Sequence, residues 1–222
     1  MRLAAVSVVV VAVLGARPMA AEAAGHVTVC GSGCNYASIS AALPNVSAGG
    51  TIEVLDAEHT EAGILVDKDV TIAGLGASDT IVQAHTSRGG ATQRVFEISA
   101  GAEVTIRDLT IRHGNVAGSS PKGGGILNHG TLTLARVAVT ANDAVGVSGT
   151  FGGTAHGGGV YSDGDLSVLD STISLNSAEG GAGDAVGGDG EGGGLYAAGG
   201  SARLVNVTVS GNEVRKGYAC GG

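Results

Sequence analysis

The chain has 222 residues, a formal net charge of −8 at neutral pH and an aromatic content of only 3%. The acidic balance argues against a nucleic acid or an anionic membrane surface as the partner. Sugar-binding clefts generally use aromatic platforms, and the scarcity of aromatic side chains disfavours a cleft of that kind.

Residues 1–23 have the pattern of a secretory signal peptide. Arg2 supplies the positive charge, residues 4–15 form an apolar run, and Ala21-Glu22-Ala23 is a small-x-small cleavage site. The run is too short for a stop-transfer helix, and no other segment is apolar enough to span a membrane. We therefore expect a protein that is secreted or held at the cell surface, with a mature chain that starts at residue 24.

Residues 24–50 are expected to cap the N-terminal end of a domain that extends over 24–222. Ile39, Leu43 and Val46 lie at helical spacing and would form one apolar face. A short amphipathic helix here would cover the apolar cross-section that the first coil of a solenoid exposes. Cys30 and Cys34 stand just before it, and in an exported chain they are expected to form a disulfide. A zinc half-site is the alternative, but no second Cys/His pair has the required spacing.

Short segments with the alternating apolar pattern of β-strands follow from residue 51 onward. The expected strands cover residues 51–54, 64–66, 70–72, 81–83, 96–98, 104–106 and 109–111. Each is only a few residues long and is separated from the next by a turn. We expect them to form the first levels of a stack.

Residues 123–212 contain one pattern three times. Glycine triplets begin at Gly123, Gly157 and Gly192, which are 34 and then 35 residues apart, and an apolar residue follows each triplet. Two further short strands with alternating apolar residues complete each unit. A fixed period of this size is typical of a solenoid. Three strands per unit, with a turn at each corner, predict an all-β fold: a single-stranded parallel β-helix of about five coils.

An asparagine closes each unit. These residues are Asn142, Asn176 and Asn212, with Asn115 in the same position one unit earlier. Asparagine readily accepts the left-handed backbone conformation that a tight corner requires. In stacked coils, amide side chains at equivalent positions also hydrogen-bond to one another. We therefore expect an asparagine ladder through these four residues.

Three N-terminal segments carry a family resemblance: residues 29–39 (VCGSGCNYASI), 50–54 (GTIEV) and 68–72 (KDVTI). Together with the glycine-triplet coils, they resemble secreted bacterial right-handed parallel β-helix repeat proteins of the pectate-lyase-like superfamily. The resemblance covers the whole mature chain and implies a right-handed helix. It is specific for the fold alone, because this architecture hosts lyases, hydrolases, esterases, adhesins and surface proteins.

The catalytic motifs of the enzymes in that superfamily are not found. The chain lacks the Asn-Thr-Asp triplet and the Asp-Asp pair of polygalacturonases, and it has no tryptophan for the motif of pectate lyases. Pectin methylesterases require two aspartates and an arginine on adjacent levels, and the nearest candidates are Asp163, Asp165, Asp170, Arg136 and Arg203. Arg136, Asp170 and Asn206 share one repeat position, so a surface salt bridge at a corner is the favoured interpretation.

Three histidines, His113, His129 and His156, each precede a glycine. No nucleophile or orienting carboxylate repeats beside them in the sequence. Histidines in turns are usually solvated, and we expect the same here. The sequence therefore assigns no catalytic residue.

Two weaker binding hypotheses remain. Tyr161 and Tyr196 occupy the same position on adjacent coils, so they should point outward and stack, either as simple packing, which we favour, or as a small ligand-binding platform. Asp184, Asp189 and Glu191 lie in a glycine-rich loop that is similar to a calcium-binding nonapeptide. Three carboxylates are few for calcium, so a flexible loop without a cofactor is favoured over a calcium site. The loop at 145–156 has the composition of a linker.

The sequence predicts a secreted, non-catalytic β-helix that acts as a surface, adhesive or matrix-associated protein, with a polysaccharide or a cell-surface component as its partner. A carbohydrate-active enzyme (lyase, hydrolase or esterase) and a calcium- or polysaccharide-binding module are the alternatives. No polar cap follows Asn212, and Cys220 is left over if Cys30 bonds to Cys34. We expect a C-terminal end that is truncated or uncapped, or that closes by end-to-end self-association.

Overall fold

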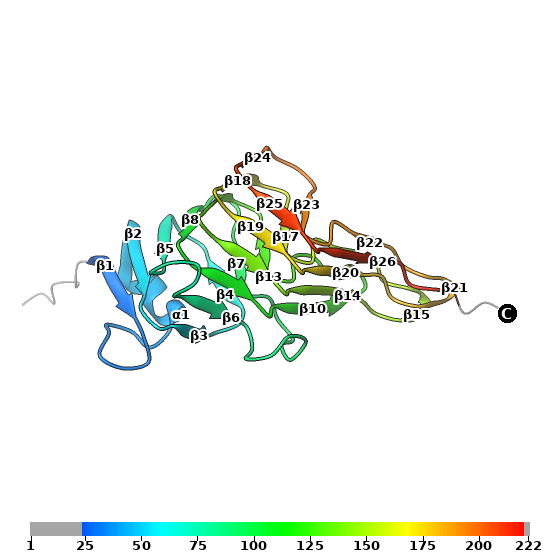
Figure 1. Ribbon diagram of the computed structural model, residues 1–222, viewed down its shortest axis with the longest axis horizontal. Coiled ribbons are helices and arrows are strands. Elements are labelled where there is room, and N and C mark those ends of the chain that lie inside the picture. The colour runs from blue at the N-terminus through cyan, green and yellow to red at the C-terminus, as the bar shows by residue number, and fades with distance from the viewer. Residues whose placement is uncertain (1–23, 220–222) are drawn as a thin grey trace, which may run out of the picture.

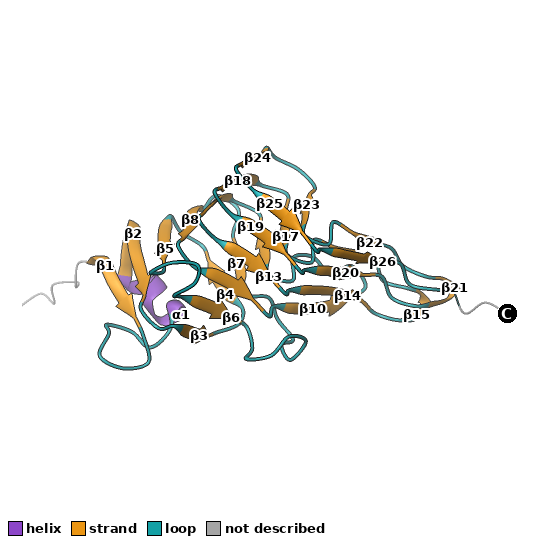
Figure 2. Ribbon diagram, in the orientation of Figure 1, coloured by secondary structure: helices purple, strands orange, loops and turns teal. Residues whose placement is uncertain are grey.

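The computed structural model describes residues 24–219. Strands run through the whole of that region, and helix is confined to its N-terminal end (Figures 1 and 2). The strands pair in parallel and in chain order, one coil upon the next, which confirms the predicted parallel β-helix. The predicted signal peptide and Cys220 lie outside the described residues. Within those residues, no helix is long and apolar enough to cross a membrane.

Three sheets form the walls of the helix, and each complete coil contributes one strand to each. Sheet A contains β1 (Ala24–Val29), β2 (Val46–Val54), β5 (Val70–Ala73), β8 (Glu103–Arg107), β12 (Thr131–Ala135), β18 (Asp165–Leu169) and β24 (Ala202–Val205). Sheet B contains β3 (Glu58–Thr60), β6 (Ile81–Gln83), β9 (Thr110–Arg112), β13 (Ala138–Thr140), β19 (Thr172–Ser174) and β25 (Thr208–Ser210). Sheet C contains β4 (Ile64–Val66), β7 (Phe96–Ile98), β11 (Ile126–Asn128), β17 (Val160–Ser162) and β23 (Leu195–Ala197).

The core consists of columns of aliphatic side chains that point inward from the three sheets. In sheet A, for example, Ile72 pairs in register with Ile106, and both side chains are fully buried. Because strand residues alternate between the two faces, every second residue of each strand joins such a column. In the last described coil the columns lose their cover: Leu204 is 42% exposed, whereas Val168, its partner one coil earlier, is fully buried. Closure by self-association stays a prediction.

The helix of the N-terminal cap is shorter than expected, and the cap also includes a strand. Helix α1 (Ile39–Ala42) is followed by a 3-10 turn, η1 (Leu43–Asn45), and Ser38 caps α1 by accepting a hydrogen bond from the Ala41 backbone N–H at 3.1 Å. The side chains of Ile39 and Leu43 are buried, as the apolar stripe predicted. Strand β1 precedes the helix and begins sheet A, so the cap also extends the sheet by one strand.

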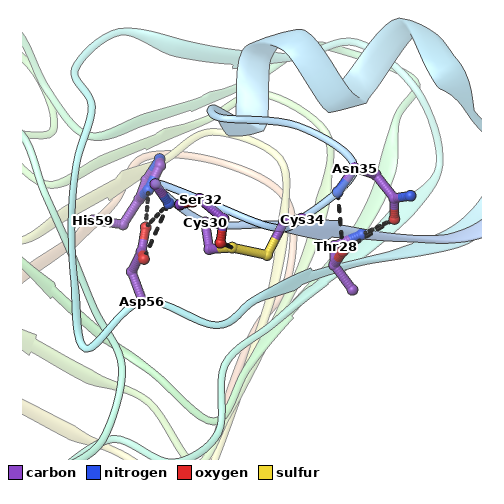
Figure 3. Close-up of a disulfide and its surroundings, with 8 residues drawn as sticks. Thr28, Cys30, Ser32, Cys34, Asn35, Asp56 and His59 are labelled. Atoms are coloured by element: carbon purple, nitrogen blue, oxygen red, sulfur yellow. Dashed lines mark hydrogen bonds and ion pairs between the residues drawn. A yellow bond between two sulfur atoms is a disulfide. The ribbon is translucent and has the colours of Figure 1, made fainter.

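A disulfide joins Cys30 to Cys34 in the loop between β1 and α1 (Figure 3). The Asp56 carboxylate accepts hydrogen bonds from the Gly31 backbone N–H at 3.1 and 3.0 Å and lies 3.4 Å from His59 Nδ1. The disulfide loop is therefore fastened to the first coil through a single carboxylate. The cysteine pair forms a disulfide and not half of a zinc site.

The glycine-rich loops form an ordered projection that we call the fin. Its base is sheet D, which contains β10 (Asn115–Gly118), β14 (Asp143–Gly146), β20 (Ser177–Glu179) and β26 (Glu213–Arg215). Beside sheet D, β16 (Ala155–His156) pairs with β22 (Gly190–Glu191), and farther out β15 (Gly149–Phe151) pairs with β21 (Gly183–Val186). The fin extends away from the helix toward the C-terminal end of the picture (Figure 1). The sequence interpretation of a linker-like loop at 145–156 and a flexible loop at 180–191 is thus wrong.

The glycines of each triplet have separate steric roles, which residues 157–159 illustrate. Gly157 has a φ of +65°, a left-handed conformation that glycine adopts at no steric cost. A Cβ on Gly158 would lie 2.2 Å from the Ser177 carbonyl oxygen in sheet D. A Cβ on Gly159 would lie 2.5 Å from the Gly194 carbonyl oxygen and 2.9 Å from the amide of Asn176. The triplet is required because the chain turns there and then passes between the next coil and the asparagine ladder.

The variant Gly159→Ala is therefore expected to lose about 2–3 kcal/mol of stability, because the added methyl group must displace backbone or a buried amide. The matched control is Gly118→Ala, since an added Cβ at Gly118 would meet nothing within 4 Å. Urea unfolding of both variants measures the difference. Equal midpoints for the two variants would show that the space beside Gly159 can adjust.

Three of the four predicted ladder asparagines form a continuous chain of hydrogen bonds. Asn142 Nδ2 donates to Asn176 Oδ1 at 2.9 Å, and Asn176 Nδ2 donates to Asn212 Oδ1 at 3.0 Å. The Asn176 oxygen also accepts from the Asn142 backbone N–H at 3.0 Å, and the Asn212 oxygen accepts from the Asn176 backbone N–H at 3.1 Å. Asn142 and Asn176 are fully buried. The ladder thus satisfies backbone groups at a corner where the strand pattern is interrupted.

Asn115 was wrongly placed in the ladder. It pairs in register with Asp143, and the ladder position of that coil is Gly114, whose N–H donates to Asn142 Oδ1 at 2.9 Å. The left-handed residue of the corner is also not the asparagine but the residue before it, as Ala141 (φ 54°) and Leu175 (φ 57°) illustrate. The amide is therefore chosen for its hydrogen bonds and not for backbone freedom.

Candidate functional site

An open groove of about 610 Å³ lies between sheet C and β10, the first strand of the fin. One side is the outer face of sheet C with the segment before β7, and the other is the chain that leads from β10 to the first glycine triplet. Polar residues make up most of the lining: Thr92, Gln93, Arg94, Glu97, Ser119, Ser120, Lys122 and His129. The groove is thus rich in hydrogen-bonding groups and sits where the fin meets the helix.

Arg94 holds the two sides of the groove together. Its guanidinium donates to the backbone oxygens of Gly123 at 3.4 Å and Lys122 at 3.1 Å, and it forms an ion pair with Glu97. A planar guanidinium with several donors can bridge such groups in a fixed geometry. The backbone at Lys122 is therefore held in place from the segment before β7.

Outward residues of sheet C form a column that includes Leu127, Tyr161 and Tyr196. The two tyrosine rings stack as predicted, with centroids 5.7 Å apart and an interplanar angle of 13°. Lys122 Nζ lies 4.6 Å from the centroid of the Tyr161 ring, and His156 packs against Tyr196 with centroids 5.0 Å apart. Tyr161 is consequently only 5% exposed. The pair packs the base of the fin, and Tyr161 is not available as a binding platform.

Two histidine–carboxylate pairs flank sheet C, and sequence reasoning missed both. His129 Nδ1 lies 2.6 Å from Asp163 Oδ1, and His156 Nδ1 lies 3.2 Å from Glu191 Oε2. Each pair joins neighbouring coils, with separations of 34 and 35 residues. That spacing equals the repeat period and was the available signal. A hydrogen bond to Glu191 also raises the pKa of Tyr196.

His113 has a different environment. Its Nδ1 atom lies 3.0 Å from the His85 carbonyl oxygen, and burial lowers its pKa. Among the described residues it has no ion pair with a carboxylate. It is a turn residue with a φ of 59°.

The residues considered for methylesterase chemistry are dispersed. Asp163 pairs with His129, and Asp165 accepts hydrogen bonds from Ser201 at 2.8 and 2.7 Å. The expected stacking of Arg136, Asp170 and Asn206 at a corner is present: all three have positive φ, and Asn206 donates to Asp170 at 2.8 Å. Arg136, however, pairs with Asp108 one coil earlier, at 2.6 and 2.8 Å, and this hydrogen bonding lowers the pKa of Asp108. Arg203 is exposed on β24.

The carboxylates considered for calcium do not converge. Asp184 lies in the outer strand β21, Asp189 forms an ion pair with Lys216 at 2.8 Å, and Glu191 pairs with His156. In the part of the chain that the structure describes, no group of three or more histidine, cysteine, aspartate or glutamate side chains could hold a metal ion.

These features define the class of protein: a parallel β-helix solenoid with a glycine fin and a polar groove at their junction. Comparison of the chain with models of protein families, with curated proteins and with solved structures found no match.

Proposed function

We propose that this protein is a secreted, non-catalytic β-helix of the pectate-lyase-like kind, located at the cell surface or in the matrix, that binds a polysaccharide chain in the groove beside sheet C. The observation that carries the proposal is the lining of the groove. It combines hydroxyl, amide and charged groups with a small exposed apolar surface at Ala117. Sugars present the same combination of hydroxyl groups and apolar ring faces.

Local charge also favours a saccharide, including an acidic one. Arg94 and Lys122 face a single groove carboxylate, Glu97, although the whole chain has a net charge of −8. Among the described residues no salt bridge involves Lys122, whose ammonium group lies over the Tyr161 ring. A cation held by an aromatic ring retains free donors for a ligand.

The fixed geometry of the groove favours binding over catalysis. Arg94 is held by three partners, and Lys122 is held in place through its backbone oxygen. A rigid arrangement of this kind lowers the entropic cost of binding a ligand.

The test is isothermal titration of the mature chain with soluble polysaccharides, using xylan as the neutral probe and polygalacturonate as the acidic one. We expect binding to at least one, weakened by about tenfold or more in a double variant with Gln93→Ala and Lys122→Ala, because each lost hydrogen bond costs about 1 kcal/mol. Thr172→Ala, on sheet B, is the control and should bind normally. If neither polymer binds, or if the double variant binds as tightly as the parent, the groove is not the site.

A second candidate function is a carbohydrate-active enzyme, and the hydrogen bond between His129 and Asp163 favours it. A carboxylate that orients a histidine at the edge of a groove is an arrangement used for general bases. Release of reducing ends or unsaturated products from the same polymers would support it. That activity should then disappear in His129→Ala while binding is retained.

A further inference from the structure

A second cleft, of about 330 Å³, lies on the outer face of sheet D, and we call it the sheet D cleft. Its floor is formed by Asn115, Asp143 and Ser177, which are paired in register on three successive strands and therefore point to the same side. Arg88 reaches over from the loop that follows β6. No residue of this cleft lines the groove beside sheet C.

Two polar atoms of the cleft are buried without a hydrogen-bond partner among the described residues: Asn115 Oδ1 and Ser177 Oγ. Ser177 is only 6% exposed. The orientation of the Asn115 amide follows from its Nδ2 atom, which donates to the Ala91 carbonyl oxygen at 3.1 Å. Buried polar groups are nearly always paired, so an unpaired amide oxygen and an unpaired hydroxyl on residues that line one cleft indicate a place for a ligand.

The charged groups around these atoms already pair with one another. Arg88 binds the Asp143 carboxylate through Nε at 3.0 Å and Nη2 at 2.6 Å. Arg215 pairs with Glu213 at 2.7 Å and with Glu179 at 3.5 Å. A metal cation would meet two guanidinium groups, and an anion would meet three carboxylates. The ligand should therefore be neutral.

The two open atoms also define the groups that the ligand must carry. An amide oxygen only accepts, so the ligand must offer a donor there, whereas a serine hydroxyl can both donate and accept. Between them, the Asp143 oxygens keep lone pairs for a further donor. A neutral ligand with several neighbouring hydroxyl groups meets all three requirements, and the volume is at the lower end of the range for small-molecule sites, about 300–1,000 Å³.

We propose that the sheet D cleft binds a single neutral sugar unit. One hydroxyl donates to Asn115 Oδ1, a second exchanges hydrogen bonds with Ser177 Oγ, and Asp143, oriented by Arg88, accepts from a hydroxyl between them. This site is independent of the groove beside sheet C, and it would bind a free monosaccharide or the end of a glycan whether or not the groove binds a polymer.

The test uses saturation-transfer NMR of the mature chain with glucose, galactose and mannose as probes. We expect at least one to bind, and both Ser177→Ala and Asn115→Leu to weaken that binding by about tenfold or more. Thr172→Ala, on sheet B and outside the lining of both the cleft and the groove, is the matched control and should leave monosaccharide binding unchanged.

The melting temperature of Ser177→Ala supplies a second, independent readout. Because Ser177 Oγ has no partner among the described residues, its removal should leave the melting temperature unchanged or raise it while sugar binding falls. A lower melting temperature with unchanged binding would assign the hydroxyl a structural role and overturn the proposal. The absence of binding by all three sugars, or binding of galacturonate alone, would overturn it equally.

Discussion

The variant Asn176→Ala is expected to lose about 3–4 kcal/mol of stability, because its side chain is fully buried and serves four hydrogen bonds. The amide oxygen accepts from the backbone and side-chain nitrogens of Asn142, and the amide nitrogen donates to Asn212 and to the Val139 carbonyl oxygen. Alanine would leave the buried backbone N–H of Asn142 unpaired and would remove one hydrogen bond each from the Asn142 amide, the Asn212 amide and the Val139 carbonyl oxygen. Leaving a buried group unpaired costs about 1–3 kcal/mol, and part of that cost is recovered by local adjustment.

Chemical unfolding of the mature chain measures this loss, with Thr172→Ala as the control. Thr172 is on the neighbouring strand β19, is half-buried, and makes no side-chain hydrogen bond to another described residue. The control should change stability by less than about 0.5 kcal/mol. A loss in Asn176→Ala no greater than in the control would mean that the ladder does not hold the coils together.

The second large effect is expected at His59, which stands in the inward column of sheet B. That column is aliphatic in the next coils, where Val82 pairs with His59 and Ile111 follows. The ring lies between Glu61, at 3.0 Å from Nε2, and Asp56. Glu61 in turn accepts from the first backbone N–H groups of α1, at 2.7 and 3.0 Å. His59 therefore connects the helix and the disulfide loop of the cap to the first coil.

The pKa directions around His59 give the pH dependence of this connection. Hydrogen bonding to Glu61 raises the pKa of His59 above its ordinary value of 6.5. Burial acts to raise the pKa of Glu61, but hydrogen bonds from His59 and Ser40 outweigh it and hold that pKa below 4.5. The His59 contribution is thus complete below pH 6.5 and is lost as pH rises through the raised pKa. The Glu61 contribution is complete above pH 4.5 and is lost as pH falls through the lowered pKa.

At a pH between 4.5 and 6.5, His59→Val should therefore lose about 3 kcal/mol, because two carboxylates lose their shared cation. Unfolding curves measured there and at about pH 8.5 should show the difference between parent and variant becoming smaller at the higher pH. Val82→Ala, in the same column, is the control for lost packing, and its effect should not depend on pH. A His59→Val difference that stays constant across this range would contradict a protonated histidine at this position.

Much of the fold could be predicted from the sequence because the repeat period identifies which residues occupy equivalent positions on successive coils. Glycine triplets at 123, 157 and 192 mark equal points on successive coils, and strand pairing joins the residues that follow them in the expected register. The stack of Tyr161 on Tyr196 follows from the same period. The ladder was shifted at its first member because the corner before Asn115 contains a histidine and a glycine, His113 and Gly114, where later coils have an asparagine in the second place.

The candidate sites were harder to predict because they depend on where the loops pack. Glycine-rich segments lack the alternating apolar pattern of strands, so the strands of the fin could not be predicted. The groove and the cleft are both lined by residues of the fin, so neither could be predicted without it. His129 and Asp163 were both noticed but were not paired, although one period separates them. His59 was missed because only one residue of its strand, β3, points into the core, and that residue is a histidine instead of an aliphatic one.

The fin has an evolutionary consequence. Several of its layers contact one another directly through backbone: a Cβ on Gly152 would lie 1.9 Å from the Gly181 carbonyl oxygen, and one on Gly188 would lie 2.0 Å from that of Gly153. Because no side chains separate the layers at these glycines to absorb a mismatch, one residue inserted in a single loop would displace the pairing of the loops above and below. Loop lengths in the fin should therefore change in concert, and descendants of this gene should gain or lose whole layers far more readily than single residues.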